Sequence, residues 1–265
     1  MGILNLTPDS FSDGGRLPNP EAAARQARWM LRDGAAVLDI GAQSTRPGAV
    51  EVGAREELHR LLPALDAIRA CHPKAVISID TFHAEVAEVA LSRGANWIND
   101  VSGGHRDPRI LHVVAEAGCP YVLMHRRGDS RTMDQLAVYC DVVAEVREEL
   151  LRSSDCALAA GVKPEQLIWD PGLGFAKTTQ HNLDLLRRLS ELSQEGFPLL
   201  LGPSRKRFIG AVLNESHPHA RVWGTTAVCS LAIQAGVNGL RVHDVRPAVQ
   251  TARMADAILG TVSYC

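Results

Sequence analysis

The stretch AVISIDT (75–81) decides the fold, because an apolar run of strand length ends in an acidic residue, Asp80. A charged residue is foreign to a hydrophobic core. The pattern of an apolar run that carries or ends in a polar residue recurs in GILNL (2–6), AVLDI (36–40), WIND (97–100), LIWD (167–170), PLLLGPSRK (198–206) and GLRVHD (239–244). In a barrel of alternating strands and helices, the carboxyl ends of all strands meet at one rim. We therefore expect residues spread along most of the chain to converge on one pocket.

Eight strand-like runs alternate with helical sequence along the whole chain, which predicts one α/β domain over residues 1–265 with a (β/α)8 TIM barrel fold. A doubly wound open sheet is the alternative, but it needs fewer strands. The expected strands lie near 2–6, 36–40, 75–80, 96–99, 120–125, 167–170, 198–202 and 239–243. One expected helix begins at Pro20, and the others cover about 52–71, 83–93, 108–117, 134–160, 180–195, 219–236 and 245–260.

The composition narrows the class of protein. With 28 basic and 30 acidic residues among 265, the formal net charge is −2, which argues against a nucleic-acid or membrane-surface partner. The six cysteines are dispersed without a Cys-x-x-Cys pair, a usage typical of reduced thiols and a cytoplasmic location. No apolar run is long enough to span a membrane.

Three polar residues end the third, fourth and sixth predicted strands: Asp80, Asn99 and Asp170. Each by itself could cap the helix that follows it. Together at one barrel mouth, their carboxylate and amide groups suit a ligand rich in N–H donors and ring acceptors, such as an aminopyrimidine-type ring. Such a pocket would reject analogues that leave its polar groups unpaired.

A basic group consists of Arg46, Lys206, Arg241 and His243. Lone basic residues are usually solvated surface charges. Arg241 and His243, however, stand two apart on one strand and so face the same side. Phosphate commonly binds near the last strands of a barrel, and arginine can hold it through two hydrogen bonds. We read His125 and the remaining histidines as structural.

Two further features come from the loops. Asn5 ends the first strand, where it either starts the turn at Thr7-Pro8 or supplies an oxygen ligand to Mg²⁺ that also carries a diphosphate. Phe11, Pro47 and Phe175 either pin their loops or form a flat slot for an aromatic co-substrate.

Seven motifs together resemble the dihydropteroate synthase family: NLTPDSFSDGG (5–15), STRPG (44–48), ISIDT (77–81), INDVSGG (98–104), DPGLGFAK (170–177), GPSRK (202–206) and RVHDV (241–245). They stand in the family's order. The resemblance implies a pterin-binding (β/α)8 barrel that joins 6-hydroxymethyl-7,8-dihydropterin diphosphate to 4-aminobenzoate and releases diphosphate, in folate biosynthesis. It also implies a transferase that uses Mg²⁺, is the target of sulfonamides and forms a homodimer.

The resemblance assigns site residues by role. The pterin would be held by Asp80, Asn99, Asp170 and Lys206. The diphosphate would be held by Asn5, Arg46, Arg241 and His243, with Asn5 as the metal ligand. The aminobenzoate side would be shaped by Thr45, Arg46, Pro47, Phe11, Phe175 and Lys206.

The sequence departs from the family pattern at several positions. Ala42-Gln43 replaces Gly-Glu before STRPG, and Ala176 replaces a glycine. Arg207 follows SRK where Ser or Thr is common, so we expect it either to pair with the aminobenzoate carboxylate or to face solvent. The alternatives are a pterin-binding methyltransferase, against which STRPG and SRK argue, and a non-catalytic paralogue, against which the intact Lys206, Arg241 and His243 argue.

Overall fold

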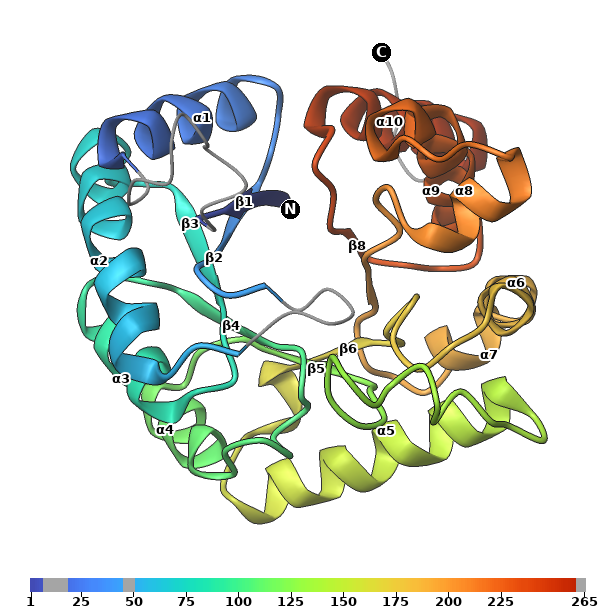
Figure 1. Ribbon diagram of the computed structural model, residues 1–265, viewed down its shortest axis with the longest axis horizontal. Coiled ribbons are helices and arrows are strands. Elements are labelled where there is room, and N and C mark those ends of the chain that lie inside the picture. The colour runs from blue at the N-terminus through green and yellow to red at the C-terminus, as the bar shows by residue number, and fades with distance from the viewer. Residues whose placement is uncertain (7–18, 45–50, 261–265) are drawn as a thin grey trace.

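The computed structural model describes residues 1–6, 19–44 and 51–260, in which eight parallel strands are surrounded by helices (Figure 1). Six strands form one sheet in sequence order, and the last two form a pair. The strands are β1 (Gly2–Asn5), β2 (Val37–Gly41), β3 (Val76–Asp80), β4 (Trp97–Asp100), β5 (Tyr121–Met124), β6 (Leu167–Asp170), β7 (Leu200–Leu201) and β8 (Gly239–Leu240).

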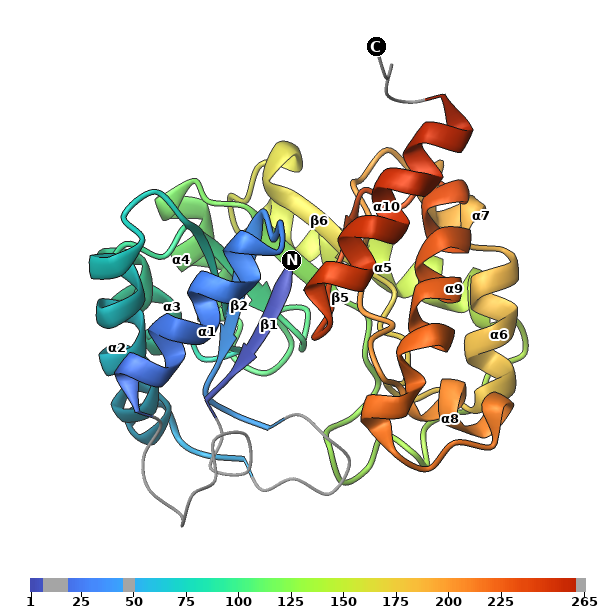
Figure 2. The same ribbon diagram turned by 90° about the horizontal axis from the view of Figure 1, so that it is seen from above.

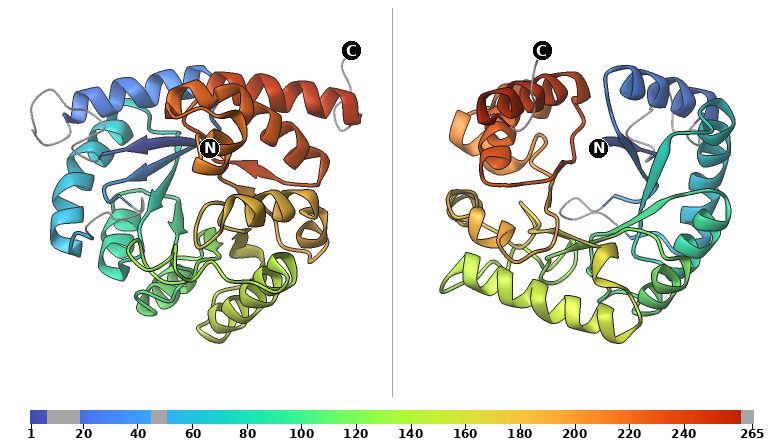
Figure 3. Two further views of the ribbon diagram at one scale, coloured as in Figure 1. Left: turned by 45° about the vertical axis from the view of Figure 1, so that its right-hand side comes forward. Right: turned by 180° about the vertical axis from the view of Figure 1, so that it is seen from behind.

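Two single bridges close the ring of strands. Trp169 on β6 pairs with Leu199 before β7, and Gly2 on β1 pairs with Val242 after β8, both in parallel. The pair β7–β8 is short because Pro203, which lacks a backbone N–H, follows soon after β7. The closed order confirms the predicted (β/α)8 barrel, and Figure 3 shows the helical layer from two further sides. The doubly wound alternative is wrong.

The helices of the described residues lie outside the strands. They are α1 (Pro20–Arg32), α2 (Ala54–Cys71), α3 (Ala84–Ser92), α4 (Arg109–Ala117), α5 (Val142–Ala159), α6 (Thr179–Arg187), α7 (Ser190–Ser193), α8 (Arg207–Leu213), α9 (Val222–Gln234) and α10 (Val245–Leu259). None of them is long and apolar enough to cross a membrane.

Local hydrogen bonding explains where the helices differ from the prediction. The helix expected from 134 begins at Val142, because Asp141 caps it by accepting from the N–H groups of Val143 at 2.9 Å and Ala144 at 3.1 Å. The stretch expected as one helix over 180–195 is divided into α6 and α7. Helix α8, which begins directly after the SRK motif, was not expected.

Alternation along β4 sorts polar side chains to opposite faces. Asn99 donates to Asp39 on β2, whereas Asp100 accepts from the Tyr121 hydroxyl at 2.7 Å and from the N–H groups of Ser102 and Gly104. Neighbouring residues of a strand point to opposite sides. Asp100 therefore shapes the loop after β4, and Asn99 is left for the barrel mouth. The carboxyl end of β1 points to one edge of the molecule, and the end of α10 lies at the opposite edge (Figure 2).

Candidate active site

The strand register brings the predicted polar residues to one level. Asn5 on β1 lies opposite Gly41, Gly41 lies opposite Asp80, and Asp80 lies opposite Asn99. Gly41 leaves room for its neighbour, because a Cβ at that position would lie 3.3 Å from the Asp80 Cβ. The carboxyl ends of β1 to β4 thus present Asn5, Asp80 and Asn99 side by side.

A buried ion network crosses the barrel at this level. Arg241, which follows β8, donates from Nε to Asp39 Oδ2 at 2.6 Å and from an Nη to Asp80 Oδ2 at 2.6 Å. Asn99 Nδ2 also donates to Asp39 Oδ2, at 3.2 Å. Two carboxylates, one guanidinium and one amide are therefore joined in a single cluster.

Burial governs the charges in this cluster. Burial raises the pKa of Asp80 to about 7, with Asp39 and Asp100 adding to the rise while Arg241 lowers it. Arg241 is fully charged, because Asp39 and Asp80 raise its pKa although burial alone would lower it. The cluster thus keeps a fixed positive charge beside a carboxyl whose charged form burial disfavours and Arg241 favours.

Asp170 and Lys206 lie on the other side of the barrel. Asp170 Oδ1 accepts from the Gly172 N–H at 2.7 Å, and burial raises the pKa of the carboxyl. A Cβ on Gly202 would lie 3.8 Å from Asp170 Oδ2 and 4.0 Å from the Arg241 Cβ, which places Asp170 next to the network. Burial lowers the pKa of Lys206 to about 8, and its Nζ lies 4.3 Å from the centre of the Phe175 ring.

His243 is oriented by Ser204 of the SRK loop. The Ser204 Oγ accepts from the His243 backbone N–H at 3.1 Å and lies 2.9 Å from Nδ1. Burial, together with the charges of Arg205 and Arg241, lowers the pKa of His243 to about 3. The imidazole is therefore neutral, and if the hydroxyl donates to Nδ1, the proton is on Nε2. A neutral Nε2–H can donate one hydrogen bond into the mouth.

An apolar cluster lies at the ends of β3 to β6. Phe82, Val101 and Met124 are buried together, and Phe175 packs against them. Phe175 thus has one side on this cluster and the ammonium of Lys206 near its ring face. Such a surface can receive a flat ring.

Four predicted site residues lie outside the described residues: Phe11, Thr45, Arg46 and Pro47. Asn5 is described and half-buried at the end of β1. Within residues 1–6, 19–44 and 51–260, no group of three or more His, Cys, Asp or Glu side chains could hold a metal ion.

Sequence reasoning assigned no functional role to three residues that the structure joins to the site, and it read one of them, His125, as structural. Asp39 interrupts the apolar run AVLDI two positions before Gly41, so period-2 alternation could have placed it on the inner face. Lys177 and His125 form a buried hydrogen bond of 2.8 Å beneath the loop after β6. Their pairing depends on contact between two loops, for which the sequence holds no signal.

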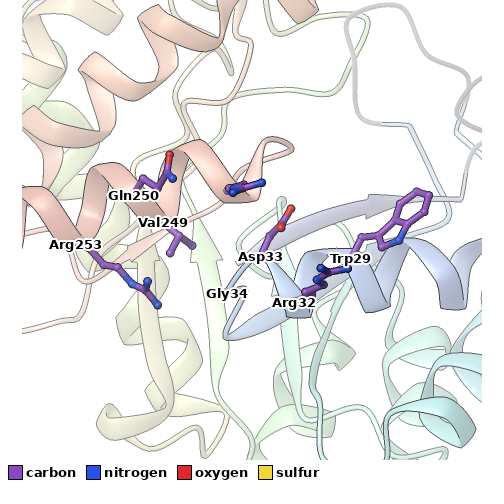
Figure 4. A pocket seen from close by; sticks show the side chains of 8 residues that line it. Trp29, Arg32, Asp33, Gly34, Val249, Gln250 and Arg253 are labelled. Atoms are coloured by element: carbon purple, nitrogen blue, oxygen red, sulfur yellow. The ribbon is translucent and has the colours of Figure 1, made fainter.

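A second cleft, of about 650 Å³, lies on the outside of the barrel between the end of α1 and the first turns of α10 (Figure 4). Its lining includes Trp29, Arg32, Asp33 and Arg253. It contains none of the predicted site residues. We therefore assign the chemistry to the mouth.

The chain is similar to known proteins of one enzyme family. The profile of the pterin-binding enzyme family matches residues 1–243. The dihydropteroate synthase of a Synechocystis strain is 50% identical over 258 residues, covering 97% of this chain and 89% of that protein. The Xanthomonas albilineans dihydropteroate synthase solved with 4-aminobenzoic acid has a TM-score of 0.90 at 42% identity, covering 97% and 92% of the two chains. The Yersinia pestis dihydropteroate synthase solved with a sulfonamide drug has a TM-score of 0.91 at 39% identity, covering 98% and 93%.

The chain belongs to the pterin-binding enzyme family, and its fold matches that of a solved dihydropteroate synthase. Within that family its activity is that of a dihydropteroate synthase, a transferase of folate biosynthesis. The expected family and its transferase activity in folate biosynthesis are thereby confirmed.

Proposed function

We propose that the barrel mouth joins 6-hydroxymethyl-7,8-dihydropterin diphosphate to 4-aminobenzoate and releases diphosphate. The observation that carries the proposal is the cluster in which Asp39, in the middle of β2, and Arg241, just after β8, are joined to Asp80 and Asn99 near the carboxyl ends of β3 and β4. It sets hydrogen-bond acceptors for a nitrogen-rich ring beside a fixed cation for a phosphate group. A methyltransferase would have no evident use for that cation or for the SRK loop.

The pterin ring would be recognised by Asp80, Asn99 and Asp170 as acceptors for its N–H groups, with Lys206 as donor to a ring acceptor. Asn99 uses its amide nitrogen on Asp39, so its oxygen is left for the ligand. Asp170 has one oxygen engaged by Gly172, which leaves the other for the ring. Analogues without these N–H groups would leave buried acceptors unpaired, at a cost of about 1–3 kcal/mol each.

The diphosphate would bind Arg241 and the Nε2–H of His243, together with Arg46. Asn5 fits a magnesium ion because its amide oxygen is a hard ligand at the same rim, and Mg²⁺ commonly takes only one or two protein oxygens beside phosphate and water. When bound, the ion would neutralise charge on the departing diphosphate.

The reaction begins as the bond between the pterin methylene carbon and the diphosphate oxygen breaks. The electron pair leaves with the diphosphate, which Arg241 and His243 receive. The positive charge on the methylene spreads into the ring, where the carboxylates of Asp80 and Asp170 stabilise it in a site with little water. The neutral amine of 4-aminobenzoate then forms the C–N bond, and its extra proton passes to water.

The aminobenzoate would stack against Phe175 and Lys206, with Thr45, Arg46, Pro47 and Phe11 completing the slot. The position of Phe175 on the apolar cluster supports this assignment. Sulfonamides, which share the aniline ring and an acidic substituent, would compete for the same slot.

The decisive experiment measures diphosphate release from the pterin diphosphate with and without 4-aminobenzoate, and with Mg²⁺ or a chelator. We expect release coupled to formation of dihydropteroate, and loss of rate without the ion. Methyl transfer from a folate without diphosphate release would favour the methyltransferase. No turnover with either substrate pair would favour a non-catalytic protein.

A homodimer is supported by large apolar side chains exposed on adjoining helices. Trp223 and Leu231 lie on α9, and Met254 and Ile258 lie on α10, which packs against α9. A second copy of this chain would cover them. Sedimentation of Ile258→Glu against the exposed control Val138→Glu tests this, since only the α10 variant should become monomeric.

The expected cytoplasmic location stays a prediction.

A further inference from the structure

The loop from Pro171 to Ala176, which follows β6 and carries Phe175, lies directly on His125 at the end of β5. The backbone N–H of His125 donates to the backbone carbonyl of Asp170 at 2.8 Å. A Cβ on Gly172 would lie 2.0 Å from the His125 carbonyl oxygen, so only glycine fits there. Ala176 has a φ of +48°, a conformation that L-residues seldom adopt. This loop shape therefore needs contacts that hold it.

Lys177, the residue that follows the loop, supplies those contacts. Its Nζ lies 2.8 Å from His125 Nδ1 and donates to the carbonyl oxygens of Gly172 at 3.1 Å and Phe175 at 3.1 Å. In its ammonium form Lys177 has three N–H donors, and these three acceptors use all of them, although burial lowers the pKa of the group to about 7. The side chain is only 6% exposed, and a buried lysine without such partners would be costly.

His125 and Glu149 orient this lysine from the side of α5. His125 Nδ1 accepts from Lys177, so its proton is on Nε2, which lies 2.9 Å from Glu149 Oε2. Glu149 is in turn held by Arg127 Nε at 3.0 Å, and the Arg127 guanidinium lies 3.9 Å from the centre of the Tyr139 ring. The chain Lys177–His125–Glu149 thus connects the loop to a long helix.

We propose that Lys177 is a positioning residue for the reaction: its ammonium, oriented by His125 and Glu149, sets the shape of loop 171–176. That shape determines where Phe175 lies relative to Lys206 and where the Gly172 N–H holds the Asp170 carboxylate. Lys177 reaches the reaction through these two residues, without touching the substrates. This proposal rests on the proposed function, because it concerns the slot for the aromatic amine.

The kinetic test compares Lys177→Met with the parent and with Lys74→Met, which removes an exposed lysine before β3. Displacing a group in an active site by about 1 Å can lower a rate on the order of a hundredfold. We expect kcat/KM for 4-aminobenzoate to fall about tenfold to a hundredfold, while the affinity for 6-hydroxymethylpterin, measured by calorimetry, should fall less, because Asp170 is only one of the four residues proposed to hold the pterin ring.

Restoring the ammonium at position 177 chemically distinguishes a positioning role of Lys177 from a general role in stabilising the fold. In Lys177→Cys, alkylation with 2-bromoethylamine restores an ammonium at nearly the length of lysine, and the parent treated in the same way is the control. We expect the alkylated variant to recover kcat/KM. An active parent whose Lys177→Met variant keeps both KM values and kcat within about twofold would overturn the proposal. So would a variant that loses affinity for both substrates equally and is not rescued.

A readout independent of activity is the imidazole of His125, observed by nitrogen NMR. Burial first, and then the charge of Lys177, lower the pKa of His125 to about 4, while Glu149 raises it and Arg127 lowers it. In the parent, His125 should remain the neutral Nε2–H form between about pH 5 and pH 8. In Lys177→Met its pKa should rise, and an unchanged titration would contradict the proposed contact. An inactive parent would count against the proposed function alone.

Discussion

The carboxylate of Asp39 accepts a hydrogen bond from Nε of Arg241 at 2.6 Å, although 202 residues separate the two in sequence. The same oxygen accepts from Asn99 Nδ2 at 3.2 Å. Asp39 is fully buried in the middle of β2, and it fixes both the direction of the guanidinium and the face of the amide. The Asp39 carboxylate thus orients Arg241 on the diphosphate side of the mouth and Asn99 on the pterin side.

Asp39→Asn should therefore weaken the binding of both the diphosphate and the pterin ring. Hydrogen bonds to charged groups contribute roughly 1.5–3 kcal/mol, so kcat/KM for the pterin diphosphate should fall on the order of tenfold to a hundredfold. Steady-state kinetics checks this against Asp66→Asn, which removes an exposed ion pair with Arg93. Equal kinetic constants in the two variants would show that Asp80 alone is sufficient to hold Arg241.

Asp80→Asn and Asp170→Asn should impair turnover far more than folding. Loss of one group that stabilises charge in a transition state commonly lowers the rate by about 10²–10³. Asp100→Asn is the matched contrast, because Asp100 holds Tyr121, Ser102 and Gly104 and should chiefly lower the melting temperature. Near-normal turnover in either Asn variant would remove that residue from the stabilisation of the pterin cation.

Glu57→Gln should stabilise the protein at alkaline pH. Glu57 on α2 is fully buried, and its carboxyl has few partners: His83 Nε2 lies 3.8 Å from Oε2, and Thr81 supplies the neighbouring hydroxyl. Burial raises its pKa from the usual 4.5 to about 7. The folded state then holds a proton that the unfolded state releases, so this group's contribution to stability is present below pH 4.5 and is lost as the pH rises to about 7.

The stability that Glu57 loses over this pH range corresponds to about 3 kcal/mol, at about 1.36 kcal/mol for each pH unit between its unfolded and folded pKa values. Urea unfolding of the parent and Glu57→Gln at pH 5 and pH 8 measures it, and the gain from the substitution should be larger at pH 8. An equal difference at both pH values would mean that Glu57 keeps an ordinary pKa in the folded state.

Ala176→Gly should raise stability slightly. The left-handed conformation at φ +48° costs a non-glycine residue about 1–2 kcal/mol, and the extra chain entropy of glycine cancels about 0.5–1 kcal/mol of the gain. We expect a net increase of about 0.5–1 kcal/mol in the free energy of unfolding, measured with urea. A decrease would indicate that the Ala176 methyl contributes more through packing than the backbone loses.

Arg207→Ser should leave the use of 4-aminobenzoate nearly unchanged. Of the two expectations for this residue, the structure shows the exposed one: Arg207 lies 63% exposed and pairs with Asp134 at 2.9 Å. Such pairs contribute only roughly 0.2–1 kcal/mol. Asp134→Ser should produce the same small change in stability, and the double variant should add nothing further. A several-fold rise in the Michaelis constant for aminobenzoate in Arg207→Ser alone would place Arg207 at the substrate carboxylate.

The amino-acid sequence by itself determined the barrel and much of the mouth. Short apolar runs alternate with helical sequence, and this pattern depends only on local periodicity and on the burial of apolar side chains. Parallel strands must present their carboxyl ends at one rim, so Asp80, Asn99 and Arg241 could be assigned to one site from their places at the strand ends.

Only the tertiary structure decided which of these groups touch one another. The role of Asp39 depends on barrel closure, which brings β2 to the residue after β8, and the role of Lys177 depends on one loop lying on another. The exposed pairing of Arg207 likewise depends on the loop before α5. Local periodicity holds no information about such contacts, because they arise between segments that are distant in sequence and meet only in the folded barrel.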